Sequence, residues 1–194
     1  MTTVPSQPSG VLRDQALHLM LSELGEAVVL VTEGDTSMVP HFRGGDAVLA
    51  VPLAAPPRRG DLLLYRQQDY WVVHRCLGWA AAPDGRSGLR TRGDGRNVLD
   101  PHLVPEDVRA RVVALRRGGA WYSLQGPPAR VYALIMAWHD LFWAAAGVVA
   151  RRAGLRRAVA AIDIGVLRLA VPLVFPLLHR RIAPPVVSLP DGTV

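Results

Sequence analysis

The 194-residue sequence contains no lysine, only one cysteine and few aromatic residues. Without lysine, no reaction of this protein uses a lysine general base or a lysine Schiff base. Without a second cysteine, an intramolecular disulfide framework is excluded, and we expect Cys76 to be a small buried hydrophobic residue rather than a nucleophile. The formal net charge of +6 therefore comes entirely from arginine.

The arginines are spread through predicted loops or gathered near the C-terminus, with no nucleic-acid motif or aromatic interleaving beside them. This distribution predicts no nucleic-acid partner and favours an anionic membrane surface instead. Half of the residues are hydrophobic, which is enough for one domain with a substantial core.

Short β-rich runs separated by turns dominate the first two thirds of the chain. They cover 27–32, 47–51, 62–66, 70–77, 108–115 and 120–124, the last two forming a hairpin. A short amphipathic helix is expected over 11–24, and loops are expected over 83–88 and 90–100. The sequence therefore predicts a mainly β fold, with an antiparallel domain over residues 1–126.

Residues 127–194 are predicted to form a helical, hydrophobic C-terminal tail, because the composition changes at Gly126-Pro127-Pro128. The run 131–150 is long enough to span a bilayer, but Asp140 lies near its middle, and 158–178 is interrupted by charges and prolines. A transmembrane hairpin, an interfacial amphipathic pair and helices packed on a protein partner remain open. Arginines flank the apolar runs, which favours contact of 131–178 with membrane lipid.

Four polar residues have the types and positions that nucleophilic catalysis needs. Ser37 stands in a turn after a predicted buried strand, and His74 lies inside the strand 70–77 on the same face as Cys76. Asp94 and Asp100 follow in a loop. A serine needs a neighbouring base to take its proton, and the base needs an orienting carboxylate.

These residues stand in four ordered signatures. They are Gly34-x-x-Ser37-Met38-x-Pro40, then Gly45-Asp46, then Arg59-Gly60-Asp61 with a strand ending in Val73-His74-Arg75, then Gly93-Asp94 with Asp100 six residues on. In this order, residues 27–118 resemble the type I signal peptidase superfamily, most closely its endoplasmic-reticulum and archaeal branch. That branch uses histidine where the bacterial branch uses lysine, in agreement with the absence of lysine here.

The resemblance implies a signal-peptidase-like antiparallel β-domain that cleaves an extended peptide after small residues, the peptide binding as an added strand. Ser37 matches the nucleophile and His74 the base. Asp100 is favoured as the third member of the triad, with Asp94 supporting or substituting. We expect the Ser37 N–H to bind the oxyanion. The chain departs from the family at Asp35, where many bacterial members carry a serine that helps the oxyanion hole.

The predicted function is that of a serine endopeptidase that cleaves a precursor or leader peptide through an acyl-enzyme, with no cofactor and no metal. Substrate contacts are expected at Met38, Pro40 and Val72. We expect a membrane-associated protein with its catalytic domain on the cytoplasmic side, because residues 1–10 lack the basic start and apolar run of a secretory signal.

Two alternatives stay open. A metal site could be assembled from His41, His74, Asp94, Asp100 and His102, although no pair of them has a recognised ligand spacing. A catalytically inactive, membrane-associated scaffold on the same fold would not need a serine, a histidine and a carboxylate together.

Overall fold

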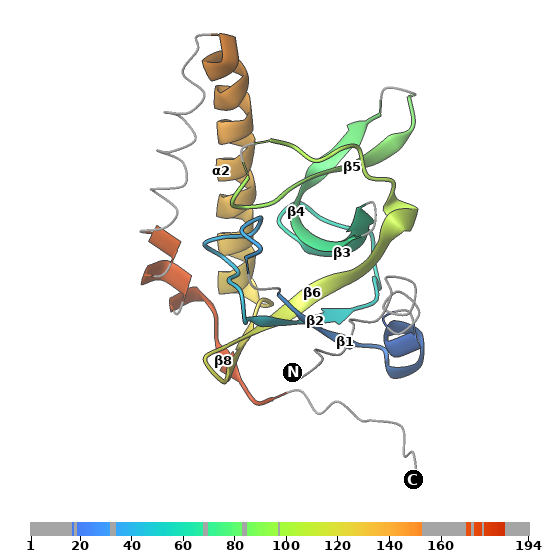
Figure 1. Cartoon of the computed structure of the whole chain (residues 1–194), viewed down its shortest axis with the longest axis vertical. Coiled ribbons are helices and arrows are strands. Elements are labelled where there is room, and N and C mark those ends of the chain that lie inside the picture. Colours follow the sequence, from blue (N-terminus) through green and yellow to red (C-terminus); the bar gives the residue numbers. More distant parts are fainter. Residues whose placement is uncertain are drawn as a thin grey trace, which may run out of the picture.

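One antiparallel sheet forms the centre of the molecule (Figure 1). The computed structural model describes residues 17, 19–31, 34–67, 70–82, 85–96, 98–152, 170–171, 173–175 and 177–184. The strands are β1 (Ala27–Leu30), β2 (Ala47–Val51), β3 (Leu62–Gln67), β4 (Tyr70–Ala81), β5 (Ser87–Arg92), β6 (Val108–Arg117), β7 (Ala120–Ser123) and β8 (Arg181–Ile182). Their order is β1-β2-β6-β3-β4-β5, with β7 paired to β6 and β8 paired to β7. The expected mainly β, antiparallel class is confirmed.

The predicted strands all form, including the hairpin of β6 and β7, but one strand was missed. Loops were expected over 83–88 and 90–100, whereas Ser87–Arg92 form β5 along β4. The reason is that β4 runs on to Ala81 instead of ending at Leu77, which gives β5 a partner. The loop expected over 90–100 therefore begins only after Arg92.

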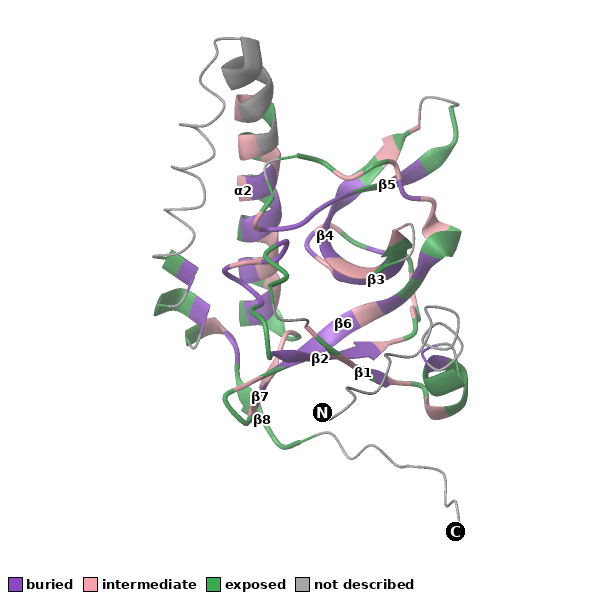
Figure 2. Ribbon diagram, viewed as in Figure 1, coloured by how far each residue is buried: buried purple, intermediate pink, exposed green. Residues whose placement is uncertain are grey.

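Helix α2 (Pro127–Arg152) stands along one side of the sheet and packs on β4 (Figure 1). Its side chains Tyr132 and Met136 are buried in the same core cluster as residues of β2, β3 and β6. Small residues on this face, Ala129 and Ala137, are 2% and 0% exposed and allow the close approach. Figure 2 shows the resulting alternation of buried and exposed bands along α2. The helical tail thus begins inside the core of the β-domain, and its separation into a unit of its own at residue 127 stays a prediction.

The N-terminal helix and the second tail segment are described only in part. Of the expected helix over 11–24, Met20–Leu24 form one short π-helical turn that ends at Gly25, whose φ is 69°. Residues 158–169 of the second apolar run lie outside the described residues, as does most of the basic loop before it. Among the described helices, α2 included, none combines the length and the apolar character needed to cross a bilayer.

Candidate active site

Ser37 lies in the turn between β1 and β2 and is 7% exposed. Its carbonyl accepts a hydrogen bond of 2.8 Å from the Gly95 N–H, which ties this turn to the loop after β5. Its own N–H donates to Oδ1 of Asp35 across 2.8 Å. The group expected to bind an oxyanion is therefore occupied by a carboxylate in this structure.

His74 lies near the middle of β4 and is fully buried, opposite Leu63 of β3. Its Nδ1 is 2.7 Å from Oδ2 of Asp100. When Nδ1–H donates to this carboxylate, Nε2 is left as a proton acceptor. Within the described part of the chain, Nε2 has no hydrogen-bond partner, so its acceptor capacity is unused.

Three side chains hold the Asp100 carboxylate in place, namely His74, Tyr65 and Thr91. The Tyr65 hydroxyl donates to Oδ2 at 3.1 Å, and the same hydroxyl is 3.0 Å from Oγ1 of Thr91. Burial raises the pKa of Asp100, but the hydrogen bond and charge of His74 and the bonds of Thr91 and Tyr65 outweigh it and leave this pKa below its ordinary value. Asp100 is therefore a carboxylate at neutral pH.

Tyr65 was not singled out from the sequence. Burial and then the Asp100 charge raise the pKa of Tyr65, so the hydroxyl keeps its proton and remains a donor. Strand alternation could have indicated that Tyr65 lies near His74, because Tyr65 is on the same face as Leu63, and Leu63 pairs with His74. That signal depends on the pairing register, which the sequence does not show.

Gly93 separates the serine turn from the histidine. A β-carbon at this position would press against the Ser37 carbonyl oxygen and lie 3.0 Å from His74 Nε2. Both groups therefore border the same small space, although no hydrogen bond joins the Ser37 hydroxyl to His74 among the described residues. The structure thus brings Ser37, His74 and Asp100 to one place, with Nε2 on the serine side and Nδ1 on the carboxylate side.

Among the described residues, no hydrogen bond or ion pair joins the Asp94 carboxylate to His74. The Asp94 carboxylate accepts a bidentate hydrogen bond from Arg75. The Nε–Oδ1 distance is 2.9 Å, the Nη2–Oδ2 distance is 2.7 Å, and both side chains are buried. Its N–H lies 3.4 Å from the sulfur of Met38, next to Ser37. The Arg75–Asp94 pair therefore lies beside the serine turn, whereas Asp100 is the carboxylate that contacts the histidine.

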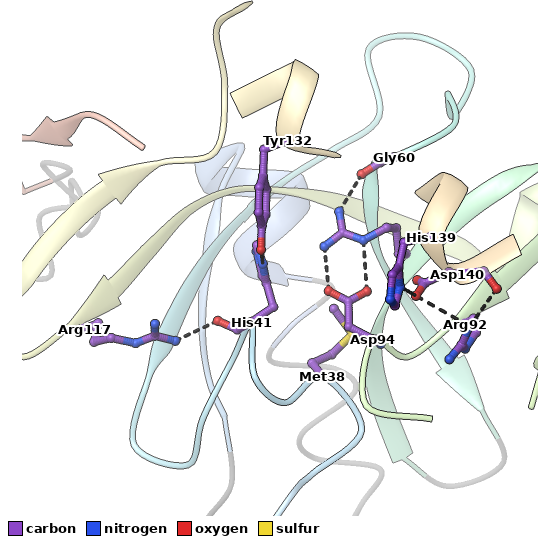
Figure 3. A network of polar contacts seen from close by, with 10 residues as sticks. Met38, His41, Gly60, Arg92, Asp94, Arg117, Tyr132, His139 and Asp140 are labelled. Carbon is purple, nitrogen blue, oxygen red and sulfur yellow. Dashed lines mark hydrogen bonds and ion pairs between the residues drawn. The ribbon is translucent and has the colours of Figure 1, made fainter. Parts of the chain in front are cut away.

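A second buried pair joins α2 to this region (Figure 3). Nη1 of Arg92, the last residue of β5, donates to the Asp140 carbonyl at 2.6 Å and lies 3.6 Å from Oδ1 of Asp140. Burial, followed by the charge of Asp94, raises the pKa of Asp140 to about 6. Asp140, which interrupts the apolar run 131–150, is therefore buried within the protein and contacts the end of β5.

The other expected site residues differ in accessibility. Met38 and Pro40 are buried, and Val72 is half-buried on the His74 face of β4. Burial raises the pKa of Cys76 to about 11, so its thiolate form is strongly disfavoured. Among the described residues, no three histidine, cysteine, aspartate or glutamate side chains gather as metal ligands.

No protein-family model matches the chain. One curated relative is similar to part of the chain. That relative is the signal peptidase complex catalytic subunit sec11 of Dictyostelium discoideum, which is 32% identical over 84 residues. The match covers 42% of this chain and 46% of that protein, so the chain spans about half the length of its relative. The chain is thus a distant, partial homologue of a signal peptidase catalytic subunit.

Proposed function

We propose that this protein is a serine endopeptidase in which Ser37 is the nucleophile, His74 the general base and Asp100 the orienting acid. The observation that carries the proposal is the 2.7 Å contact of His74 with Asp100, on the far side of the imidazole from the serine turn. The partial similarity to a signal peptidase catalytic subunit supports the reaction class.

In the proposed reaction, His74 Nε2 takes the hydroxyl proton as Ser37 Oγ attacks a peptide carbonyl. Asp100 keeps the proton of His74 on Nδ1 and stabilises the imidazolium that forms. The imidazolium then gives its proton to the leaving amine, and the peptide bond breaks to leave an acyl-serine. Water, deprotonated by His74, releases the acyl group. A short movement must first bring the serine hydroxyl within hydrogen-bond distance of Nε2.

The oxyanion of this reaction needs a donor, and we assign this role to the Ser37 N–H. Asp35 accepts from that N–H in the structure, so its carboxylate must leave when a substrate carbonyl arrives. Asp35 is exposed, and solvent compensates its displacement.

We propose an extended precursor or leader peptide with small residues before the scissile bond as the substrate. The experiment is cleavage of such a peptide by the purified protein, followed by mass spectrometry, with Ser37→Ala, His74→Ala and the matched controls Ser87→Ala and His102→Ala. Both site variants should lose nearly all activity, whereas the controls keep it. Cleavage by Ser37→Ala at the wild-type rate would refute the assignment. Peptide binding without cleavage by the wild type, unchanged in Ser37→Ala, would support an inactive scaffold instead.

We also propose that α2 contacts membrane lipid. Four apolar side chains at helical spacing are more than half exposed on it: Val131, Ile135, Trp138 and Phe142. The Trp138 ring is 4.5 Å from the guanidinium of Arg59, which places a cation beside this surface. Flotation with anionic vesicles should carry the wild type, but not a Trp138→Ser, Phe142→Ser double variant. Equal flotation of both would contradict lipid contact, and Val98→Ser is the control.

A further inference from the structure

A cavity of about 250 Å³ lies on the other side of the sheet from the His74–Asp100 pair. Its walls come from the loop before β3, from β4 and β6, and from the first turns of α2, and His41 and His179 also line it. On β4 it is bordered by Arg75, the neighbour of His74, and successive side chains of a strand point to opposite faces. The cavity is therefore distinct from the proposed catalytic site.

The lining of this cavity has more positive than negative charge. Four arginines line it, Arg58, Arg75, Arg111 and Arg130, against a single carboxylate, Asp61. The Asp61 carboxylate is shared, with Oδ1 3.1 Å from Nη1 of Arg130 and Oδ2 3.3 Å from Nε of Arg111. Asp94, outside the cavity, offsets Arg75. The four arginines and the two carboxylates together therefore carry a net positive charge, and Arg58 is the arginine of this set without a carboxylate partner in the described structure.

Arg58 is the arginine with spare donors. Its main-chain N–H donates to Asp61, at 2.8 Å, but its guanidinium makes no ion pair or hydrogen bond within the described residues. Because this side chain is exposed at the rim, it can turn toward an incoming anion without loss of a contact.

His41 adds a buried polar atom without a partner. The side chain is 1% exposed, and its Nδ1 is 3.1 Å from the Tyr132 hydroxyl (Figure 3). When the hydroxyl donates to Nδ1, the proton of the imidazole lies on Nε2, which has no hydrogen-bond partner in the described structure. A buried donor of this kind costs free energy unless something accepts from it.

We propose that this cavity binds an oxyanion of the phosphate class, held by Arg58, Arg111 and Arg130 with His41 Nε2 as a further donor. The arginines come from a loop, a strand and a helix, so donors approach from several directions. A tetrahedral phosphate group presents acceptors to all of them, whereas a planar carboxylate is satisfied by one guanidinium fork. The inference goes beyond the proposed peptidase function and does not depend on it.

The electrostatics of the histidine agree with an anion. Burial, and then the positive charges of Arg75, His179 and Arg117, hold the pKa of His41 well below its ordinary value. A bound phosphate would offset these positive charges and remove part of this unfavourable potential.

Calorimetric titration of the full chain with inorganic phosphate tests the proposal, at an ionic strength held constant with chloride. The wild type should bind phosphate and unfold at a higher temperature in its presence, and acetate should bind more weakly. Arg58→Gln and Arg130→Gln should each weaken phosphate binding by about tenfold or more, since each removes a charge-assisted hydrogen bond. Arg90→Gln, an exposed arginine on β5, is the control.

Absence of phosphate binding, acetate binding as tight as phosphate, or equal affinities in Arg58→Gln, Arg130→Gln and Arg90→Gln would each overturn the proposal. The Arg58 side chain is exposed and makes no ion pair or hydrogen bond in the described structure, so Arg58→Gln should fold normally. This variant therefore tests the proposal even if Arg130→Gln is unstable. Titration with a short-chain phosphatidic acid distinguishes the source of the phosphate group. Tighter binding than that of inorganic phosphate assigns a lipid headgroup, and weaker binding assigns the free anion.

Discussion

The main-chain N–H of Ser37 donates a 2.8 Å hydrogen bond to Oδ1 of Asp35. In the proposed acyl transfer, this N–H is the donor that we assign to the negative oxygen formed when Ser37 attacks. A carboxylate on the same N–H both occupies the donor and repels the new negative charge. Asp35 is therefore expected to restrain catalysis.

The first prediction concerns a substitution that removes the Asp35 carboxylate. Asp35→Ser should raise kcat/KM toward a small-residue peptide by about tenfold, or about 1.4 kcal/mol of transition-state stabilisation. Asp107→Ser, at another exposed aspartate, should leave kcat/KM unchanged. Unchanged or lower activity of Asp35→Ser, with an unaltered melting temperature, would show that the Ser37 N–H is not the oxyanion donor.

The second prediction concerns the carboxylate at the histidine. Asp100→Asn should lower kcat by about a thousandfold to ten-thousandfold, because an amide no longer fixes the imidazole tautomer or stabilises the imidazolium. Tyr65→Phe removes a hydrogen bond to Asp100 but keeps the carboxylate, so a loss of about tenfold is expected. Steady-state peptide cleavage measures both, and similar losses in the two variants would contradict the triad.

The third prediction is that Asp94 contributes to the free energy of unfolding rather than to the reaction. Asp94→Asn leaves Arg75, which is 1% exposed, beside a neutral partner. Removing one member of such a pair costs about 3–5 kcal/mol. Urea denaturation should therefore show a larger loss of unfolding free energy for Asp94→Asn than for Asp100→Asn. The reverse order would contradict a stabilising role for the Arg75–Asp94 pair.

The fourth prediction follows from the lowered pKa of His41. In the unfolded chain this group titrates near its ordinary pKa of about 6.5, whereas in the folded protein it stays neutral to lower pH. The unfolded state therefore binds the extra proton, and stability present above pH ~6.5 is lost as the pH falls below it, by up to about 1.4 kcal/mol per pH unit.

His41→Gln should remove this slope, measured as urea-unfolding free energies between about pH 7.5 and pH 5. Asp140 acts in the opposite direction over part of this range, because its pKa is raised to about 6 and protonation favours its folded form. The difference between wild type and His41→Gln isolates the histidine. Parallel pH profiles for the two proteins would contradict the prediction.

Local patterns predicted much of this molecule, and the contacts between distant segments were the part that they missed. The strand runs could be predicted from residue types and spacing, whereas the roles of Ser37, His74 and Asp100 rested on the family that their ordered signatures resemble. The structure shows the contact of His74 with Asp100 and places the Ser37 turn beside them, and the roles stay a proposal. The strand Ser87–Arg92 could not be predicted, because its glycine and arginines resemble a loop until the long β4 provides a partner. In the sequence, Asp140 only interrupts an apolar run. Its partner Arg92 could not be predicted, since only the tertiary structure places the two side by side.

The last prediction tests the space between the serine turn and the histidine. Gly93→Ala puts a methyl group against the Ser37 carbonyl and 3.0 Å from His74 Nε2, so one of these two groups must move. Overpacking of this kind costs about 1–3 kcal/mol of stability, which leaves the protein folded if its total stability is ordinary. Because the displacement falls on the proposed proton path, we expect peptide cleavage to drop by about a hundredfold, far more than the melting temperature suggests. Reaction with a serine-directed fluorophosphonate, followed by intact-mass measurement, should slow in parallel. Full activity of Gly93→Ala would mean that Ser37 and His74 do not meet across this glycine during the reaction.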